Sequence, residues 1–176
     1  RVLTISPAQW LTQTFHDLHS IFKTFDGLMM ASVLIGVINE NTGEMWYFNA
    51  EHPWTVVYRD GKAEFIENEL SLRKLGSPSE FEFAVKHYQL RPGDVLFVGS
   101  DGRDDLDMSG GAVQRQINED EGLFLRVVEE GRGDIRQMVH IIKRTGDITD
   151  DLSLLRIAFQ PTGTGRAEGQ KLFEEG

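Results

Sequence analysis

The spacing of hydrophobic positions changes several times along the chain, and each change predicts a different element. Between residues 6 and 25, apolar side chains recur three and four positions apart, which is the spacing of one helix face. Ser6-Pro7 is a typical helix start, because serine caps the first turn and proline fits there. From Met29 the pattern becomes that of strands. Segments 29–50 and 54–66 predict two hairpins, the second with Asp60-Gly61 at its turn.

The rest of the pattern predicts two strands, two helices and a last strand, at residues 81–90, 95–100, 121–131, 134–146 and 152–159. This order predicts the α+β fold class, with mostly antiparallel strands in sheet layers flanked by helices. We expect residues 1–159 to form one domain and 160–176 to be a linker or tail. Within the tail, "AEGQKLFEEG" is also similar to the opening helix of a tetratricopeptide repeat.

The composition of the chain excludes several kinds of binding partner and reactive group. A length of 176 residues fits one domain with a sizeable core. The net charge of −10 argues against nucleic acid or an anionic membrane as the main partner. The chain has no cysteine, which excludes disulfides and a cysteine nucleophile and fits the reducing cytoplasm. Its apolar runs are too short to span a membrane.

Asp-Gly occurs three times, and the flanking residues separate the three cases. Asp26-Gly27 follows a predicted helix and ends it, whereas Asp60-Gly61 joins two strands. Asp101-Gly102 follows an apolar strand but precedes no strand, so a hairpin does not explain it. The neighbouring acidic positions, which we expect to be solvated, are Asp104, Asp105 and Asp107.

A second acidic segment lies just before the last strand and contains Asp147, Asp150 and Asp151. Two acidic strand ends of this kind can converge at one edge of a sheet. Clustered carboxylates are unfavourable unless a cation joins them, and Mg²⁺ and Mn²⁺ prefer carboxylate oxygens. The alternative is that both segments are ordinary solvated surface.

Other chemistries find less support in the sequence. His16 and His19 share a helix face, but no carboxylate is placed to complete a zinc site. The glycine-rich segment 109–112 lacks the lysine of a phosphate-binding loop, and there is no G-x-S-x-G element of a serine hydrolase.

Three motifs in order carry a family resemblance: "FNAEHPW" (48–54), "LRPGDVLFVGSDG" (90–102) and "ITDDLSLLRI" (148–157). They resemble the patterns N-A-G-H-x-P, G-D-x-[hydrophobic]-[ST]-D-G and D-D-x-[ST]-L-L of the SpoIIE/RsbU-type serine phosphatases. These enzymes belong to the metal-dependent, protein phosphatase 2C-like (PPM) superfamily. The resemblance extends over residues 6–159.

The resemblance implies a β-sandwich flanked by helices, with a two-metal Mn²⁺ or Mg²⁺ centre that activates water against a phosphoserine or phosphothreonine. By motif, Asp101 and Asp150 are the expected catalytic metal ligands. Asp151 and Gly102 are expected to support them without binding the ions. Asn49 and His52 are expected to be structural. The implied substrate is a phosphoprotein similar to an anti-sigma-factor antagonist in bacterial signalling.

The sequence also departs from the family patterns. The early G-D-x-x-D-like and D-x-x-G-H-G elements, which supply further metal ligands, do not occur, and the chain begins just after the point where they would end. Glu51 stands where N-A-G-H has glycine, and "RDDLD" replaces the more frequent "[VL]-x-E-A" after Asp101-Gly102. The exposed face of the first helix could pack against a missing segment or against a second copy in a homodimer.

Three interpretations therefore compete. The first is a metal-dependent protein serine/threonine phosphatase domain, and the second is a degenerate, non-catalytic PPM-like module that binds a partner protein. The third is an unrelated acidic α+β domain. In that case the carboxylates of Asp101 and Asp150 would lie more than about 8 Å apart, too far to share an ion.

We expect the segment by itself to bind metal weakly and to have little or no phosphatase activity, because the early acidic motifs are not in it. The measurement is phosphatase activity with Mn²⁺ on this segment and on the full parent protein. Robust turnover by the segment alone would contradict the expectation.

Overall fold

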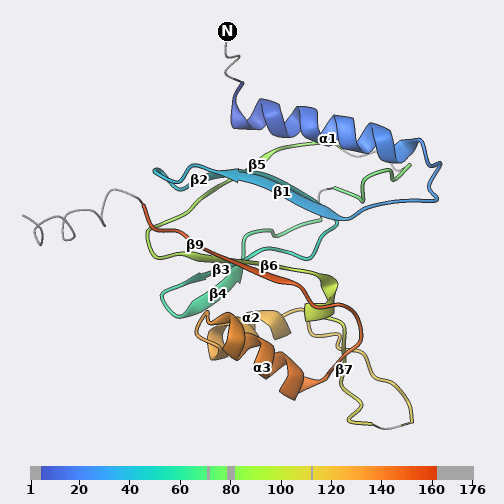
Figure 1. Ribbon diagram of the computed structural model, residues 1–176, viewed down its shortest axis with the longest axis vertical. Helices are drawn as coiled ribbons and strands as arrows, with labels where there is room; N and C mark the ends of the chain where they lie inside the picture. Colours follow the sequence, from blue (N-terminus) through green and yellow to red (C-terminus); the bar gives the residue numbers. More distant parts are fainter. Residues whose placement is uncertain (1–4, 71, 79–81, 112, 162–176) are drawn as a thin grey trace, which may run out of the picture.

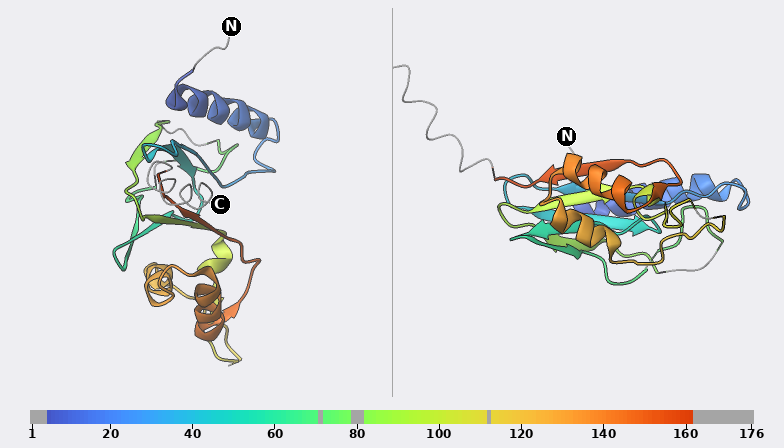
Figure 2. Two further views of the ribbon diagram at one scale, coloured as in Figure 1. Left: turned by 60° about the vertical axis from the view of Figure 1, so that its left-hand side comes forward. Right: turned by 90° about the horizontal axis from the view of Figure 1, so that it is seen from below.

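The computed structural model describes residues 5–70, 72–78, 82–111 and 113–161, which stack in four layers (Figure 1). Helix α1 (Pro7–Lys23) covers the outer face of one sheet. Helices α2 (Leu123–Glu130) and α3 (Ile135–Thr145) cover the outer face of the second. The two views of Figure 2 agree that α1 lies on the opposite side of the sheets from α2 and α3. Residues 162–176, most of the predicted tail, lie outside the described part.

Both sheets are antiparallel. The first has the strand order β1-β2-β5, with β1 at Val33–Ile38, β2 at Glu44–Ala50 and β5 at Lys86–Gln89. The second has the order β4-β3-β6-β9, with β3 at Val56–Arg59, β4 at Lys62–Phe65, β6 at Val95–Gly99 and β9 at Leu154–Ala158. Three short elements were not predicted: the single 3₁₀ turn η1 (Asp101–Arg103) and the paired strands β7 (Leu106–Asp107) and β8 (Asp147–Ile148).

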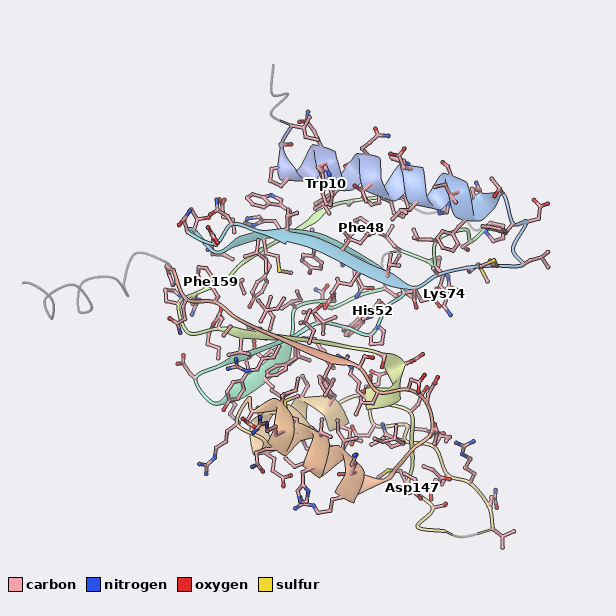
Figure 3. All side chains as sticks on the ribbon, viewed as in Figure 1. Trp10, Phe48, His52, Lys74, Asp147 and Phe159 are labelled. Carbon is pink, nitrogen blue, oxygen red and sulfur yellow. The ribbon has the colours of Figure 1, made fainter. Side chains whose placement is uncertain are left out.

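An apolar core fills each of the three spaces between neighbouring layers. The central strands are therefore covered on both faces. In β2, Phe48 and Ala50 pack toward α1, whereas Met45 and Tyr47 face the other sheet. Figure 3 shows Phe48 beside α1 and Phe159 between the two sheets. The third core lies between the second sheet and the two C-terminal helices and includes Val56, Phe97, Phe124, Val127, Met138 and Ile142.

The predicted fold class and most of the predicted elements are confirmed. The Ser6 side chain accepts a hydrogen bond from the Gln9 N–H at 3.2 Å, and the Gln9 side chain accepts one from the Ser6 N–H at 2.9 Å, so the first helix begins as predicted. Asp60-Gly61 forms the turn between β3 and β4, with φ of 50° and 83°. Within the described ranges, no helix combines the length and apolar character needed to cross a membrane.

A buried carboxylate joins the two sheets near the end of β2. Glu67 is only 4% exposed and accepts hydrogen bonds from the Asn49 side chain at 3.0 Å and from the Thr55 N–H at 2.8 Å. Asn49 belongs to the first sheet, and Thr55 leads into β3 of the second. Burial raises the pKa of Glu67, while the Asn49 amide and the Thr55 N–H act in the opposite direction.

The turn after β2 contains a strained residue. Glu51 has a φ of 54°, in the left-handed region that favours glycine, which explains the glycine of the N-A-G-H pattern at this position. The Glu51 carboxylate lies 3.7 Å from Arg73 Nε and accepts a hydrogen bond from the Lys74 N–H at 3.3 Å. The side chain therefore ties the strained turn to a neighbouring loop.

Replacing Glu67 with glutamine should change how stability depends on pH. A raised pKa means that the folded protein holds the Glu67 proton more tightly than the unfolded chain. The wild type is therefore most stable relative to E67Q at low pH, and loses this advantage as pH rises from about 4.3 through the folded pKa. The loss is about 1.4 kcal/mol for each unit of pKa difference. Urea unfolding of both proteins from pH 3.5 to 8 measures it. E119Q, which removes the same charge from an exposed position, is the control, and a pH-independent E67Q difference would contradict the prediction.

Two variants of Glu51 should separate backbone strain from side-chain contacts. E51G and E51A both lose the contacts to Arg73 and Lys74. Glycine adopts the left-handed conformation at this position without strain, whereas alanine adopts it with strain. We expect E51G to be more stable than E51A by about 1 kcal/mol in urea unfolding. Equal stabilities would show that the turn relaxes without strain.

Candidate metal centre

The pairing of β6 with β9 brings the two acidic segments together. Their register aligns Gly99 with Leu154, so the end of β6 lies beside the start of β9. Ser100 extends this pairing: its N–H donates to the Ser153 carbonyl at 3.0 Å, and its hydroxyl donates to the Asp151 carbonyl at 2.7 Å. The segment after β6 and the segment before β9 are thereby held against each other.

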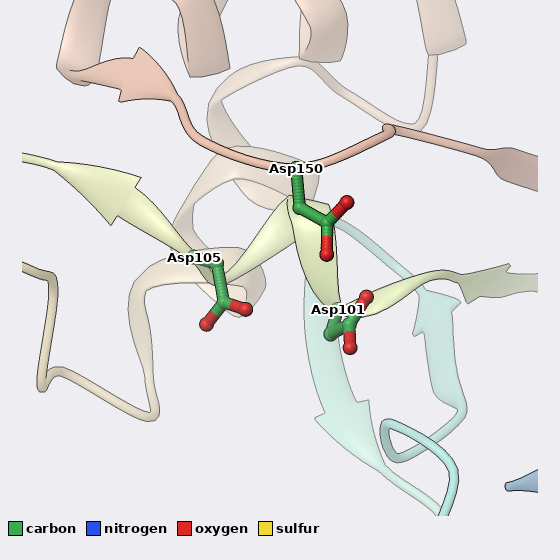
Figure 4. Close-up of side chains that lie close together, drawn as sticks. All are labelled: Asp101, Asp105 and Asp150. Carbon is green, nitrogen blue, oxygen red and sulfur yellow. The ribbon is translucent and has the colours of Figure 1, made fainter.

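Three carboxylates meet where these segments converge. Asp101, Asp105 and Asp150 each place a carboxylate oxygen within 4.8 Å of the others. Figure 4 shows the three side chains around one shared space. Asp101 and Asp150 thus satisfy the distance condition for sharing an ion, which argues against an unrelated domain. Asp105 was expected to be a solvated neighbour of the site, whereas the structure places it, half-buried, within the carboxylate cluster.

The position of Asp105 follows from two local contacts. Its N–H donates to the Asp101 carbonyl at 2.9 Å across the η1 turn, which places both carboxylates on one side of the turn. Its own carbonyl accepts hydrogen bonds from the Thr149 hydroxyl at 2.8 Å and from the Thr149 N–H at 3.2 Å. The D-x-x-x-D spacing of one helical turn was the sequence signal that could have identified Asp105.

Gly102 and Asp151 both contribute to the close approach of the two segments. A Cβ at position 102 would lie 2.6 Å from the Asp151 carbonyl oxygen and 3.0 Å from that of Asp150, distances that a side chain cannot occupy. The Asp151 N–H donates to the Asp150 carboxylate at 2.7 Å. Asp151 takes part through its main chain, while its side chain is exposed.

The other two acidic residues of the run have partners outside the cluster. Asp104 pairs with Arg103 at 3.0 Å; burial raises the pKa of this carboxyl, although the Arg103 guanidinium opposes the rise. The Asp107 carboxylate accepts hydrogen bonds from the Ser109 and Gln116 N–H groups at 2.9 and 3.2 Å. These main-chain hydrogen bonds lower the pKa of Asp107.

A cavity of about 540 Å³ opens beside the cluster and includes Asp101 and Asp105 in its lining. Its walls also carry His52, Trp54 and Lys74. Figure 3 shows His52 and Lys74 near each other on the same side of the sandwich. The segment after β7 adds Glu119, Asp120 and Glu121 to the acidic part of the lining.

The turn that carries His52 is held by Asn49. The Asn49 side chain is 7% exposed and accepts a hydrogen bond from the His52 N–H at 2.8 Å. Asn49 therefore has the structural role expected of it. His52 Nδ1 lies 3.0 Å from the Pro53 carbonyl, which can only accept, so this nitrogen carries the proton.

The three residues fit a hard divalent cation. Their donor set is made entirely of carboxylate oxygens, which suits Mg²⁺ or Mn²⁺, and two of the three side chains are exposed, which leaves room for water ligands. Like charges this close are unfavourable without a cation. Asp101, Asp105 and Asp150 would hold the ion.

Comparisons with known proteins identify the family of the chain. The family model of Stage II sporulation protein E (SpoIIE) matches residues 2–160. A search of curated proteins gave no match.

Several solved structures have a similar fold. One contains the RsbU and RsbW domains of Rv1364c from Mycobacterium tuberculosis (TM-score 0.67, 20% identity), covering 85% of this chain and 42% of that one. Another is the phosphatase domain of SpoIIE from Bacillus subtilis (TM-score 0.57, 15% identity, 91% and 77% covered). A third is the SiaA-PP2C domain of Pseudomonas aeruginosa (TM-score 0.61, 15% identity, 90% and 62% covered).

The matching chain thus spans less than half the length of the Mycobacterium protein, and at these identities the solved structures establish the fold. The family assignment comes from the model match, which extends over nearly all described residues. The chain belongs to the SpoIIE family of PP2C-like, PPM-type phosphatase domains.

Proposed function

We propose that this chain is part of a metal-dependent protein serine/threonine phosphatase of bacterial signalling. The observation that carries the proposal is the cluster of Asp101, Asp105 and Asp150, whose carboxylate oxygens lie within 4.8 Å of one another beside a cavity. The cofactor is Mn²⁺ or Mg²⁺, in a two-metal centre in the complete domain. Further ligands of such a centre come from outside the motifs that this sequence carries.

Each part of the site has a task in phosphoester hydrolysis. When bound, a divalent cation activates water and offsets the negative charge of the phosphoryl group. Asp101, Asp105 and Asp150 hold the cation, and the β6–β9 pairing keeps them together. Lys74 supplies positive charge on the cavity wall, where it would attract a phosphate.

The substrate is a phosphoprotein in the cytoplasm. We propose a protein similar to a phosphorylated anti-sigma-factor antagonist, which is the substrate class implied by the resemblance to RsbU-type phosphatases. The structural neighbour from Mycobacterium tuberculosis, which contains RsbU and RsbW domains together, supports a regulatory setting of this kind. A non-catalytic binding module would bind such a protein without releasing phosphate.

Neutralising a carboxylate of the cluster should weaken metal binding. We expect D101N, D105N and D150N each to lower Mn²⁺ affinity by about tenfold or more, because each removes an anionic donor. The measurement is titration of the chain with Mn²⁺, followed by the electron paramagnetic resonance of the free ion. The same substitutions in the parent protein should abolish Mn²⁺-dependent release of phosphate from a phosphoprotein.

D107N is the matched control, because it removes one negative charge from the same acidic run outside the cluster. Its Mn²⁺ affinity should stay within about twofold of the wild type, since the carboxylate binds main-chain N–H groups instead. If D105N behaves like D107N, Asp105 is not a ligand. If the parent protein with Mn²⁺ binds its partner but releases no phosphate, the binding-module interpretation is correct.

A further inference from the structure

Arg103 is a buried arginine inside the metal-binding segment. It lies two residues after Asp101 and two before Asp105, at the end of η1. Its side chain is 2% exposed, which makes it one of the largest fully buried side chains of the protein. Arginine is almost never buried to this extent unless its charge and its donors are used.

The guanidinium joins three parts of the structure. Its Nε donates to the Asp104 carboxylate at 3.0 Å, and its Nη2 donates to the Trp54 carbonyl at 2.7 Å. Its central carbon lies 4.2 Å from the centre of the Phe124 ring of α2. The η1 turn is thereby fixed both to the turn after His52 and to a helix of the outer layer.

Space for this side chain is provided by Gly99. A Cβ at position 99 would lie 3.0 Å from Arg103 Cδ and 2.7 Å from Leu154 Cδ2. The last residue of β6 therefore has no side chain at the point where the Arg103 side chain packs against the strand end. Within the described ranges, Arg103 Nη1 has no hydrogen-bond partner.

Burying this guanidinium is unfavourable for stability. An unsatisfied buried donor lowers stability, and whole buried ion pairs can often be replaced by apolar side chains without loss of stability. Stability alone therefore does not explain the arginine.

Attraction of the metal does not explain it either. A positive charge in the segment that carries Asp101 and Asp105 opposes the binding of a cation there. Any benefit of Arg103 to metal binding must come from geometry, because its charge acts in the opposite direction. The two effects can therefore be separated by experiment.

We propose that Arg103 is a positioning residue for the metal centre: it holds the η1 turn so that Asp101 and Asp105 face Asp150. The inference rests on the proposed metal site and adds a residue that does not itself bind the ion. Partners that orient metal ligands typically change metal affinity by 10- to 100-fold when they are removed.

R103M tests the proposal because it keeps the length and apolar packing of the side chain but removes the charge and the hydrogen bonds. We expect Mn²⁺ affinity to fall by about tenfold, with a cooperative thermal transition showing that the variant still folds. The measurements are Mn²⁺ titration by electron paramagnetic resonance and thermal unfolding of the same samples. R103K keeps the charge without the forked geometry and should weaken Mn²⁺ binding in the same direction.

R126M is the matched control. Arg126 pairs with Asp120 on the surface near the same cavity, so its loss removes one positive charge without touching the η1 turn. We expect R126M to bind Mn²⁺ within about twofold of the wild type, or more tightly, as electrostatics alone predicts.

Several results would overturn the inference. Unchanged or tighter Mn²⁺ binding by R103M would show that the charge of Arg103 matters more than its geometry. If R103M does not fold, full wild-type affinity in R103K would exclude a need for the forked contacts. If the wild type leaves the free Mn²⁺ signal unchanged at millimolar concentrations, the proposed metal site fails and this inference fails with it. If the wild type binds Mn²⁺ and R103M binds it with the same affinity, only the role of Arg103 is refuted.

Discussion

The pairing of β6 with β9 is the constraint on which the candidate site depends. These strands are far apart in the sequence, yet their register places the residue after Gly99 beside the residues before Leu154. Ser100 continues the ladder by one further step and binds the main chain at Asp151 and Ser153. The β7–β8 pair holds the same two segments on the other side of the cluster. Without these contacts, nothing would hold the three carboxylates close together.

The site combines unfavourable local features that the surrounding layers hold in place. Three carboxylates converge, a buried arginine has one donor without a partner among the described residues, and Glu51 adopts a strained conformation at the neighbouring turn. Each feature costs free energy by itself. The apolar cores on both faces of the second sheet supply the rigidity that keeps them together. A site that binds a cation can accept this arrangement, because the ion removes the repulsion.

The three Asp-Gly pairs show how much the local sequence can resolve. Asp26-Gly27 and Asp60-Gly61 both have positive φ at both residues; the second forms the expected hairpin turn, whereas the first lies in the turn after α1, which ends earlier, at Lys23. Neither residue of Asp101-Gly102 has a positive φ. Gly102 is needed because the Asp150–Asp151 main chain passes too close for a side chain. The flanking residues indicated a different role for this pair, but not the close approach that explains it.

The sequence by itself determined the helices, the strands, the layered α+β fold and the two acidic segments, because these follow from hydrophobic spacing and from local motifs. It also indicated that Asp101 and Asp150 belong together. The spacing of Asp101 and Asp105 by one helical turn is a signal in the sequence, but the tertiary structure was needed to decide which other acidic residue faces the cluster. Asp104, Asp105 and Asp107 are alike in type and close in sequence, but Arg103, Thr149 and the strand β8 turn them in different directions. The burial of Arg103 was equally hidden, because it depends on Trp54 and Phe124, which no local pattern connects to it.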